Sequence, residues 1–279
     1  MNFETVKLRE QPGVLYVTLS NPPINLMNGT MIRELFQLSG FLMQRKDLKV
    51  VVIDSADPDF FIAHFDLDEL EAGLSDPAMA GRYPDMNAVQ ALALNWQNLP
   101  QITIGKIDGR VRGGGLDLAL AFDMRLASQS SLFCFPEASG HFLACGGGTT
   151  RMLLAAGPGR ALEFLLSARD FTAAEAERYG LINRALPAGE LDAYLADLVS
   201  RIAARAPGVI AMNRDVFRRV TAPMVDSFFA GLAAENDALR RALGSGRVQA
   251  GIAAHRARGQ TRELELDLPA TLAALNADR

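Results

Sequence analysis

The alternation of apolar strands with helices constrains the fold of this chain more than any other feature of its sequence. The run KVVVIDS at residues 49–55 predicts a buried strand, residues 86–99 predict a helix, and PQITIGKID at 100–108 predicts the next strand. Two further short strands are predicted at 123–128 and 131–135. Such alternation indicates an α/β fold, although it does not give the order of the strands.

Both ends of the chain extend this pattern. The first twenty residues predict a hairpin around the turn QPG, and helical spacing follows over residues 28–46. From about residue 158 helices dominate, and one of them has Thr172 as its cap and Gly180 at its end. We therefore expect an α/β domain followed by a C-terminal helical subdomain, with the tail after residue 258 as a docking arm.

Composition argues against several classes of protein. The chain has 279 residues, of which 49% are hydrophobic, so it can bury a substantial core. Its net charge of -4 gives no bulk attraction to nucleic acid or to an anionic membrane. Cys134 and Cys145 lack metal-like spacing, and we recognise neither a signal peptide nor a membrane-spanning run. The expectation is a soluble, cytoplasmic protein without a metal site.

The run IDGRVRGGGLDLALAFD, residues 107–123, is the first candidate for chemistry. Its three glycines end a loop and open an apolar helix, and the amides of a helix start can hold an oxyanion. A tight turn packed against a strand explains the same glycines equally well. The run is neither a dinucleotide fingerprint nor a phosphate-binding loop.

Two carboxylates accompany this run. Asp117 falls in the first turn of the apolar helix, where the helix dipole alone could explain an acid. Its apolar neighbours would also perturb its pKa, which suits a proton-transfer group. Glu137 follows a proline after a short apolar strand, a common place for a solvated residue. Glu137 gains a catalytic interpretation only if it faces Asp117.

Four motifs, taken together, resemble those of the crotonase, or enoyl-CoA hydratase/isomerase, superfamily. FIAHFDL, the glycine run, FCFPE and GGTTR correspond in order and spacing to the family's A-G-A-D-[IL], N-G-x-x-x-G-G-G-x-E-L-A-L-x-x-D, F-x-x-P-E and G-G-T-Q-R. The resemblance covers about residues 5–258. It implies a spiral of ββα units over residues 1–200, and a helical region at 201–279 that assembles homotrimers or dimers of trimers.

The resemblance also implies a site and an activity in fatty acid metabolism. The main-chain N–H groups of Phe65 and Gly114 would hold the thioester oxygen of an acyl-CoA and stabilise its enolate. Asp117 and Glu137 would be the acid–base pair that adds water to a 2-enoyl-CoA. Coenzyme A is part of the substrate, so no separate cofactor is implied. The implied substrate-binding residues are Ile24, Leu26, Ala63, His64, Asp66, Leu67 and Gly113.

Asp117 and two histidines depart from the family pattern and leave more than one reaction open. Asp117 is one methylene shorter than the family's usual Glu, which gives weight to double-bond isomerisation by a single base. His64 and His141 replace usual glycines. Each could pack structurally, or could serve proton transfer in a decarboxylase or a C–C hydrolase of this fold.

A further departure concerns coenzyme A. Asp68 stands where family members often have a lysine that meets the CoA phosphates, a loss that Arg82, Arg110 or Arg112 could offset. A non-catalytic CoA-binding protein is the rival interpretation, although such a protein would need no paired carboxylates.

Overall fold

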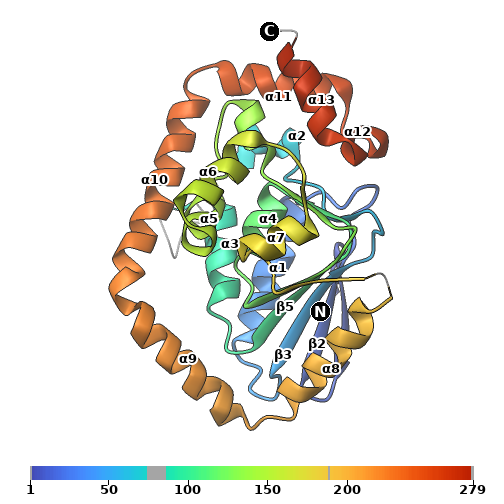
Figure 1. The fold of residues 1–279 in the computed structure, drawn as a ribbon, viewed down its shortest axis with the longest axis vertical. Helices are drawn as coiled ribbons and strands as arrows, with labels where there is room; N and C mark the ends of the chain where they lie inside the picture. Colours follow the sequence, from blue (N-terminus) through green and yellow to red (C-terminus); the bar gives the residue numbers. More distant parts are fainter. Residues whose placement is uncertain (1, 74–85, 188, 278–279) are drawn as a thin grey trace.

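Successive strands of the chain are shared between two sheets. The computed structural model describes residues 2–73, 86–187 and 189–277. The larger sheet has the order β1-β2-β3-β5-β7-β10, and the smaller sheet has the order β4-β6-β8-β9. Each of the pairs β3–β4, β5–β6 and β7–β8 therefore gives one strand to each sheet. This arrangement is the predicted spiral of an α/β fold (Figure 1).

The strands are β1 (Val6–Gln11), β2 (Val14–Leu19), β3 (Val50–Ser55), β4 (Phe60–Ile62), β5 (Ile102–Ile107), β6 (Arg110–Arg112), β7 (Met124–Ser128), β8 (Leu132–Cys134), β9 (Phe171–Thr172) and β10 (Arg184–Leu186). The helices of the core are α1 (Gly29–Leu42), α2 (Leu67–Gly73), α3 (Ala88–Gln97), α4 (Gly114–Ala119), the 3-10 helix η1 (Pro136–Gly140), α5 (Gly148–Ala156), α6 (Pro158–Ser167), α7 (Ala173–Tyr179) and α8 (Leu191–Ala203). The C-terminal helices are α9 (Pro207–Thr221), the 3-10 helix η2 (Ala222–Met224), α10 (Val225–Leu243), α11 (Arg247–Arg258), α12 (Arg262–Leu266) and α13 (Leu268–Ala277).

The apolar run of β3 is continuous because both faces of this strand are covered. Val51 and Ile53 belong to the main core with residues of α1 and α3. Val50 and Val52 belong to a second cluster with residues of α8. From β2 to β10 the larger sheet is parallel, and parallel sheets are normally covered on both faces.

Several local predictions are confirmed at the ends of helices. The side chain of Thr172 accepts a hydrogen bond from the amide of Glu175 at the start of α7, and Gly180 ends this helix with φ 79°. Pro207 opens α9, and Pro223 lies in η2 between α9 and α10. Helices α2 and α5 were not predicted, because each is short and follows a motif interpreted as a loop.

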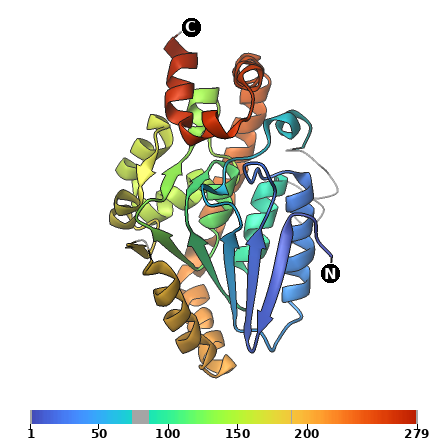
Figure 2. The same ribbon diagram turned by 90° about the vertical axis from the view of Figure 1, so that its right-hand side faces the viewer.

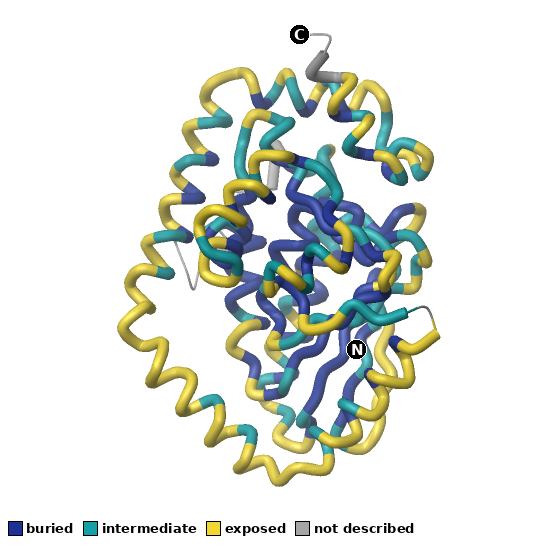
Figure 3. The backbone as a smooth tube through the Cα atoms, in the orientation of Figure 1, coloured by how far each residue is buried: buried dark blue, intermediate teal, exposed yellow. Residues whose placement is uncertain are grey.

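The C-terminal helices surround the core. Helix α9 has no buried residue and runs along one side of the molecule, as Figure 3 shows by its colour. Helices α11 to α13 then return across the end of the sheets (Figures 1 and 2). The tail after residue 258 thus docks on its own core, as expected, and Leu268 is completely buried. Within the described part of the chain, no helix combines the length and the apolar character needed to cross a membrane.

One buried carboxylate of α10 caps the start of α5. Glu235, only 3% exposed, accepts hydrogen bonds from the amides of Gly147 (2.8 Å) and Thr150 (2.6 Å). It also accepts bonds from the Thr150 hydroxyl (2.6 Å) and from the Gln90 amide (3.3 Å). A helix start leaves such donors without partners, and α5 has no side-chain cap of its own. Glu235 therefore joins the C-terminal helices to the core.

Replacing Glu235 should destabilise the fold. We expect Glu235→Ala to lower the free energy of unfolding by about 2–4 kcal/mol, because it leaves several buried donors unpaired. Glu263→Ala is the matched control, since Glu263 is exposed, and it should change stability by less than about 0.5 kcal/mol. Urea titration followed by circular dichroism measures both variants, and equal effects would contradict the role of Glu235.

Candidate active site

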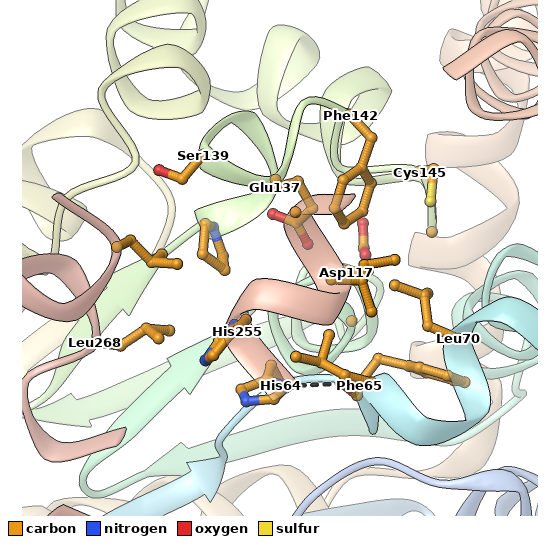
Figure 4. A pocket seen from close by; sticks show the side chains of 18 of the residues that line it. His64, Phe65, Leu70, Asp117, Glu137, Ser139, Phe142, Cys145, His255 and Leu268 are labelled. Atoms are coloured by element: carbon orange, nitrogen blue, oxygen red, sulfur yellow. Dashed lines mark hydrogen bonds between the residues drawn. The ribbon is translucent and has the colours of Figure 1, made fainter. Parts of the chain in front are cut away.

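A pocket beside α4 brings together residues from distant parts of the chain (Figure 4). It contains about 870 Å³ of empty space, part of which is open to solvent. Its walls come from the β4–α2 connection, α4, η1, the turn before α5, α11 and α13. Six residues selected from the sequence line it, namely His64, Phe65, Leu67, Gly114, Asp117 and Glu137.

Glycines allow α4 to begin directly against β4. Gly113 has φ 48° and ψ -128°, a conformation that residues with a side chain rarely adopt. A Cβ atom on Gly115 would lie 2.5 Å from the Cβ atom of Ile62, so no side chain fits between the helix and the strand. This close contact places Asp117 of the first helical turn at the wall of the pocket.

The carboxyl group of Asp117 is enclosed by a second glycine run. Asp117 is 2% exposed, and Cβ atoms on Gly146 or Gly148 would come closer than 3.0 Å to its carboxyl atoms. Its Oδ1 atom has no hydrogen-bond partner among the described residues. The sequence analysis recognised GGTTR as a motif but missed this contact, which the glycines Gly146–Gly148 ahead of a helix could have suggested.

Glu137 reaches the same cavity from the 3-10 helix η1. Pro136 begins η1 and Glu137 follows it, with 8% of its surface exposed. A Cβ atom on Gly113 would lie 2.8 Å from its Oε1 atom, so Glu137 packs against the start of α4. Its Oε2 atom is buried and has no hydrogen-bond partner in the described part of the chain. Figure 4 shows Asp117 and Glu137 at neighbouring positions, which is the condition for an acid–base pair.

Burial gives both carboxyl groups unusual acidities. Removal from water raises the pKa of Glu137 to about 7. Burial, and then the negative charge of Glu137, raise the pKa of Asp117 well above its usual range. Two carboxyl groups in one site titrate as a pair, and a pKa of about 7 lets Glu137 take up and release a proton near neutral pH.

Two main-chain amides at the pocket are free to donate. Met27 makes hydrogen bonds to the residues before and after Phe65. Its N–H donates to His64 O (2.9 Å), and its carbonyl accepts from Asp66 N–H (2.8 Å). The N–H of Phe65 between them has no acceptor among the described residues, and neither does that of Gly114. A Cβ atom on Gly114 would lie 3.4 Å from the Cβ atom of Phe65, so the two segments adjoin.

Two buried groups beside the pocket, His255 and Glu265, were missed by the sequence analysis. His64 Nδ1 lies 2.7 Å from Phe65 O, and its Nε2 lies 3.1 Å from Glu265 Oε1. His255 Nε2 lies 3.5 Å from the same oxygen, and the two imidazole rings are 5.9 Å apart (Figure 4). Glu265 belongs to the tail, about 200 residues from His64, and no signal in the sequence links them.

The arginines expected near CoA phosphates are engaged by the protein itself. Arg112 is completely buried, pairs with Asp170 (2.6 Å) and donates to the carbonyl of Glu265 (2.6 Å). Arg110 donates to the carbonyl of Leu266 (3.1 Å). Both side chains therefore hold the tail in place.

Two acidic residues near the expected CoA site, Asp68 and Asp66, also contact the C-terminal segment. Asp68, which departs from the family's usual lysine, pairs with Arg256 of α11 (2.6 Å). Arg82 lies outside the described residues. Asp66 accepts hydrogen bonds from the Asp68 amide (2.9 Å) and from Gln260 (3.1 Å) of the tail.

Several residues predicted to bind substrate do not line the pocket. Ile24 and Ala63 are completely buried and cluster with Leu26 and Leu266, because α12 covers them. Gly113 lies behind Glu137. Apolar side chains of α2, α11 and α13 line the pocket instead.

His141 is exposed and is absent from the pocket wall. It ends η1 with φ 67°, a left-handed conformation that favours glycine, which gives a physical reason for the usual glycine at this position.

The arrangement suits chemistry beside a carbonyl group. Two free amides can stabilise negative charge on a carbonyl oxygen, and two carboxyl groups of raised pKa can move protons at the neighbouring carbon. Among the described residues, no group of three or more His, Cys, Asp or Glu side chains is placed to hold a metal ion.

Comparisons with known proteins agree with this geometry. The family model described as Enoyl-CoA hydratase/isomerase matches residues 9–262. The carnitinyl-CoA dehydratase of Proteus mirabilis is 30% identical over 217 residues, which are 77% of this chain and 80% of that protein.

Solved structures show the same fold. A Streptomyces avermitilis protein, named as a putative enoyl-CoA hydratase, has a TM-score of 0.90 and 34% identity over 99% of this chain and 100% of that one. An enoyl-CoA hydratase of Bacillus anthracis has a TM-score of 0.70 and 23% identity over 82% of this chain and 91% of that one. The chain belongs to the enoyl-CoA hydratase/isomerase family, the crotonase superfamily.

Proposed function

We propose that this protein hydrates a 2-enoyl-CoA through a thioester enolate held in an oxyanion hole. The observation that carries the proposal is the placement of two unpartnered amides, of Phe65 and Gly114, beside the buried carboxyl pair. The names of the relatives, carnitinyl-CoA dehydratase and enoyl-CoA hydratase, support an acyl-CoA thioester as the class of substrate.

We assign the base to Glu137, whose pKa is about 7, and the acid to Asp117, whose pKa is raised by burial and by the charge of Glu137. Ionised Glu137 takes a proton from water as the water oxygen bonds to the β-carbon. The electrons of the double bond move toward the thioester oxygen, where the amides of Phe65 and Gly114 stabilise the enolate. Protonated Asp117 then gives its proton to the α-carbon, and a proton passing from Glu137 to Asp117 restores the resting pair. An oxyanion-hole N–H group, as proposed for Phe65 and Gly114, stabilises the transition state by about 3 kcal/mol.

Double-bond isomerisation is the second candidate. Asp117 is short, and its carboxyl group packs against Gly146 and Gly148. Its reach toward the α-carbon is therefore smaller than that of the family's usual Glu. Glu137 alone, with its pKa of about 7, could carry a proton between the two carbons on either side of a migrating double bond.

Decarboxylation, C–C hydrolysis and non-catalytic CoA binding have less support. Both ring nitrogens of His64 face groups of the protein, Phe65 O and Glu265, which leaves neither for a decarboxylase or C–C hydrolase reaction. A non-catalytic CoA-binding protein would have no use for two buried carboxyl groups of raised pKa.

The route of coenzyme A follows from the position of the tail. Ile24 and Leu26 remain the proposed contacts of the CoA moiety, yet Leu266 of α12 packs on them. Binding of CoA there would therefore require α12 to shift, which makes the tail a candidate cover of the substrate channel.

We also propose that the chain forms a homotrimer or a dimer of trimers. Helix α9 exposes a stripe of large apolar side chains, which are Met212, Val216, Phe217 and Val220. Each of these four is more than half exposed, an arrangement typical of a contact surface between proteins.

Removing either carboxyl group should abolish hydration. In heavy water, proton NMR of a short 2-enoyl-CoA with the enzyme should show a 3-hydroxyacyl-CoA carrying deuterium at the α-carbon. Asp117→Asn and Glu137→Gln should each lower this rate by about 100-fold or more, while Ser139→Ala at the same pocket is the control. Migration of the double bond without hydration would identify an isomerase, and an unchanged spectrum would overturn the proposal.

The rate should depend on the ionisation of Glu137. Glu137 must be ionised to take a proton from water. We therefore expect kcat/KM to be low at acid pH and to rise with pH through a midpoint near 7. Initial rates at low substrate concentration measure this profile. A rate that stays constant from about pH 5.5 to 8 would exclude Glu137 as the base, since its pKa lies within that window.

A charge in the apolar stripe of α9 should break the assembly. We expect Phe217→Asp to convert trimers into monomers, which light scattering after size-exclusion chromatography detects. Arg219→Ser is the control, because Arg219 pairs with Asp215 on the same helix and is 79% exposed. Monomers in the unmodified protein would contradict the proposed assembly.

A further inference from the structure

Three buried ionisable groups meet beside the pocket wall. His64 and His255 are 5% and 8% exposed, and Glu265 of α12 is completely buried. Nε2 of both histidines faces Glu265 Oε1, at 3.1 Å and 3.5 Å. Neither contact has the geometry of a hydrogen bond, since none of these atoms has a hydrogen-bond partner in the described part of the chain. The proposed chemistry uses none of the three side chains.

The contacts of His64 favour a proton on each ring nitrogen. Phe65 O is a carbonyl and can only accept, so Nδ1 must donate to it. Nε2 faces a carboxylate, which also favours a proton there. Burial disfavours a charged ring, but the charge of Glu265 and the contacts of the ring together outweigh burial and raise the pKa of His64.

The surroundings of this pair contain charges of both signs. Burial opposes the charge on Glu265 as well, but His64 and then His255 hold the pKa of Glu265 well below its usual range. Arg112 opposes the positive charge on His64 and is itself paired with Asp170. Glu137 lies within the field of His64.

His64 is bonded to the segment that carries an oxyanion-hole amide. The main chain of residues 64–66 makes two bonds to Met27, and Asp66 also accepts bonds from the amides of Asp68 and Glu69 and from Gln260. Phe65 itself is held by the bond between His64 Nδ1 and Phe65 O, which lies in the peptide after the one that carries the Phe65 N–H. A neutral ring would divide between two tautomers, of which a single one can donate to Phe65 O. A doubly protonated ring always donates to Phe65 O, and its positive charge faces Glu265.

We propose that Glu265 is a positioning residue for the oxyanion hole, because it holds His64 in the state that donates to Phe65 O. This inference rests on the proposed function of the Phe65 amide. The carbonyl of Glu265 is itself held by Arg112, and Arg262 of the same helix pairs with Asp57 and Asp59.

The test compares Glu265→Gln with Arg262→Gln. Glu265→Gln keeps the shape of the side chain but no longer demands a proton at His64 Nε2. We expect kcat to fall by about tenfold to 100-fold with little change in KM, because an oxyanion donor is displaced. Arg262→Gln weakens the docking of the same helix without touching His64, so any effect should fall on KM.

Two measurements distinguish a positioning role of Glu265 from a general loss of structure in the variant. The first is the infrared band of butanoyl-CoA labelled with ¹³C at its thioester carbonyl, whose shift to lower frequency on binding reports hydrogen bonds to that oxygen. Glu265→Gln should reduce the shift, and Arg262→Gln should not. The second is pH dependence, because the ratio of wild-type kcat to Glu265→Gln kcat should narrow toward acid pH as His64 regains its proton.

Each outcome decides between the inference and the proposed function. If the wild-type band does not shift, the oxyanion hole itself is wrong. If it shifts and Glu265→Gln retains both the full shift and a constant kcat ratio, the oxyanion hole stands and the role of Glu265 is overturned. An equal loss of kcat and of the infrared shift in Arg262→Gln would also overturn the role of Glu265, because weaker docking of α12 would then explain the effect.

A double-mutant cycle and one wild-type measurement complete the test. If Glu265 acts through His64, then Glu265→Gln should add nothing to the loss caused by His64→Gln, whereas additive losses contradict the inference. Should Glu265→Gln fail to fold, ¹⁵N NMR of the three histidines in the wild-type protein still decides, since a neutral His64 at pH 7 would overturn the proposal.

Discussion

The site depends on one close contact, that between the first turn of α4 and β4. Gly115 lies against Ile62 with no space for a side chain, so the helix begins where the strand ends. That contact brings the amide of Gly114 beside Phe65 and fixes Asp117 in the pocket wall. A side chain at Gly115 would push the helix away and separate the two amides, which is why the glycines belong to the chemistry as well as to the turn.

Burial of the carboxyl pair is unfavourable for the fold and useful for the reaction. Removal of Asp117 and Glu137 from water raises both pKa values, so ionising them in the folded protein is costly near neutral pH. The same rise lets the pair hold and release protons nearer neutral pH than free carboxyl groups do, which the proposed hydration requires. Glu235 shows how the surrounding structure compensates, since its hydrogen bonds fix the turn that encloses Asp117.

Local sequence patterns and ordered motifs were enough to predict part of the fold and part of the site. The continuous apolar run of β3, the Thr172 cap and the breaks at the prolines are local signals, and each is confirmed. The motifs also identified six of the residues that line the pocket, including Asp117 and Glu137. The position of the tail was beyond such patterns, because the contact between His64 and Glu265 joins residues about 200 positions apart and depends on the path of the C-terminal helices. The burial of Ile24 and Ala63 under Leu266 of α12 was not predicted for the same reason.

The departures from the family pattern fall into two groups. His64 and Asp68, which replace a usual glycine and a usual lysine, both contact the C-terminal segment, through Glu265 and Arg256. A histidine in place of glycine supplies a ring that a carboxylate of the tail can pair with, and an aspartate in place of lysine supplies a charge that an arginine can reach. Asp117 differs from this pair, because it faces the second carboxyl group and not the tail. The substitutions at 64 and 68 therefore concern how the site is covered, whereas the one at 117 concerns the reaction itself.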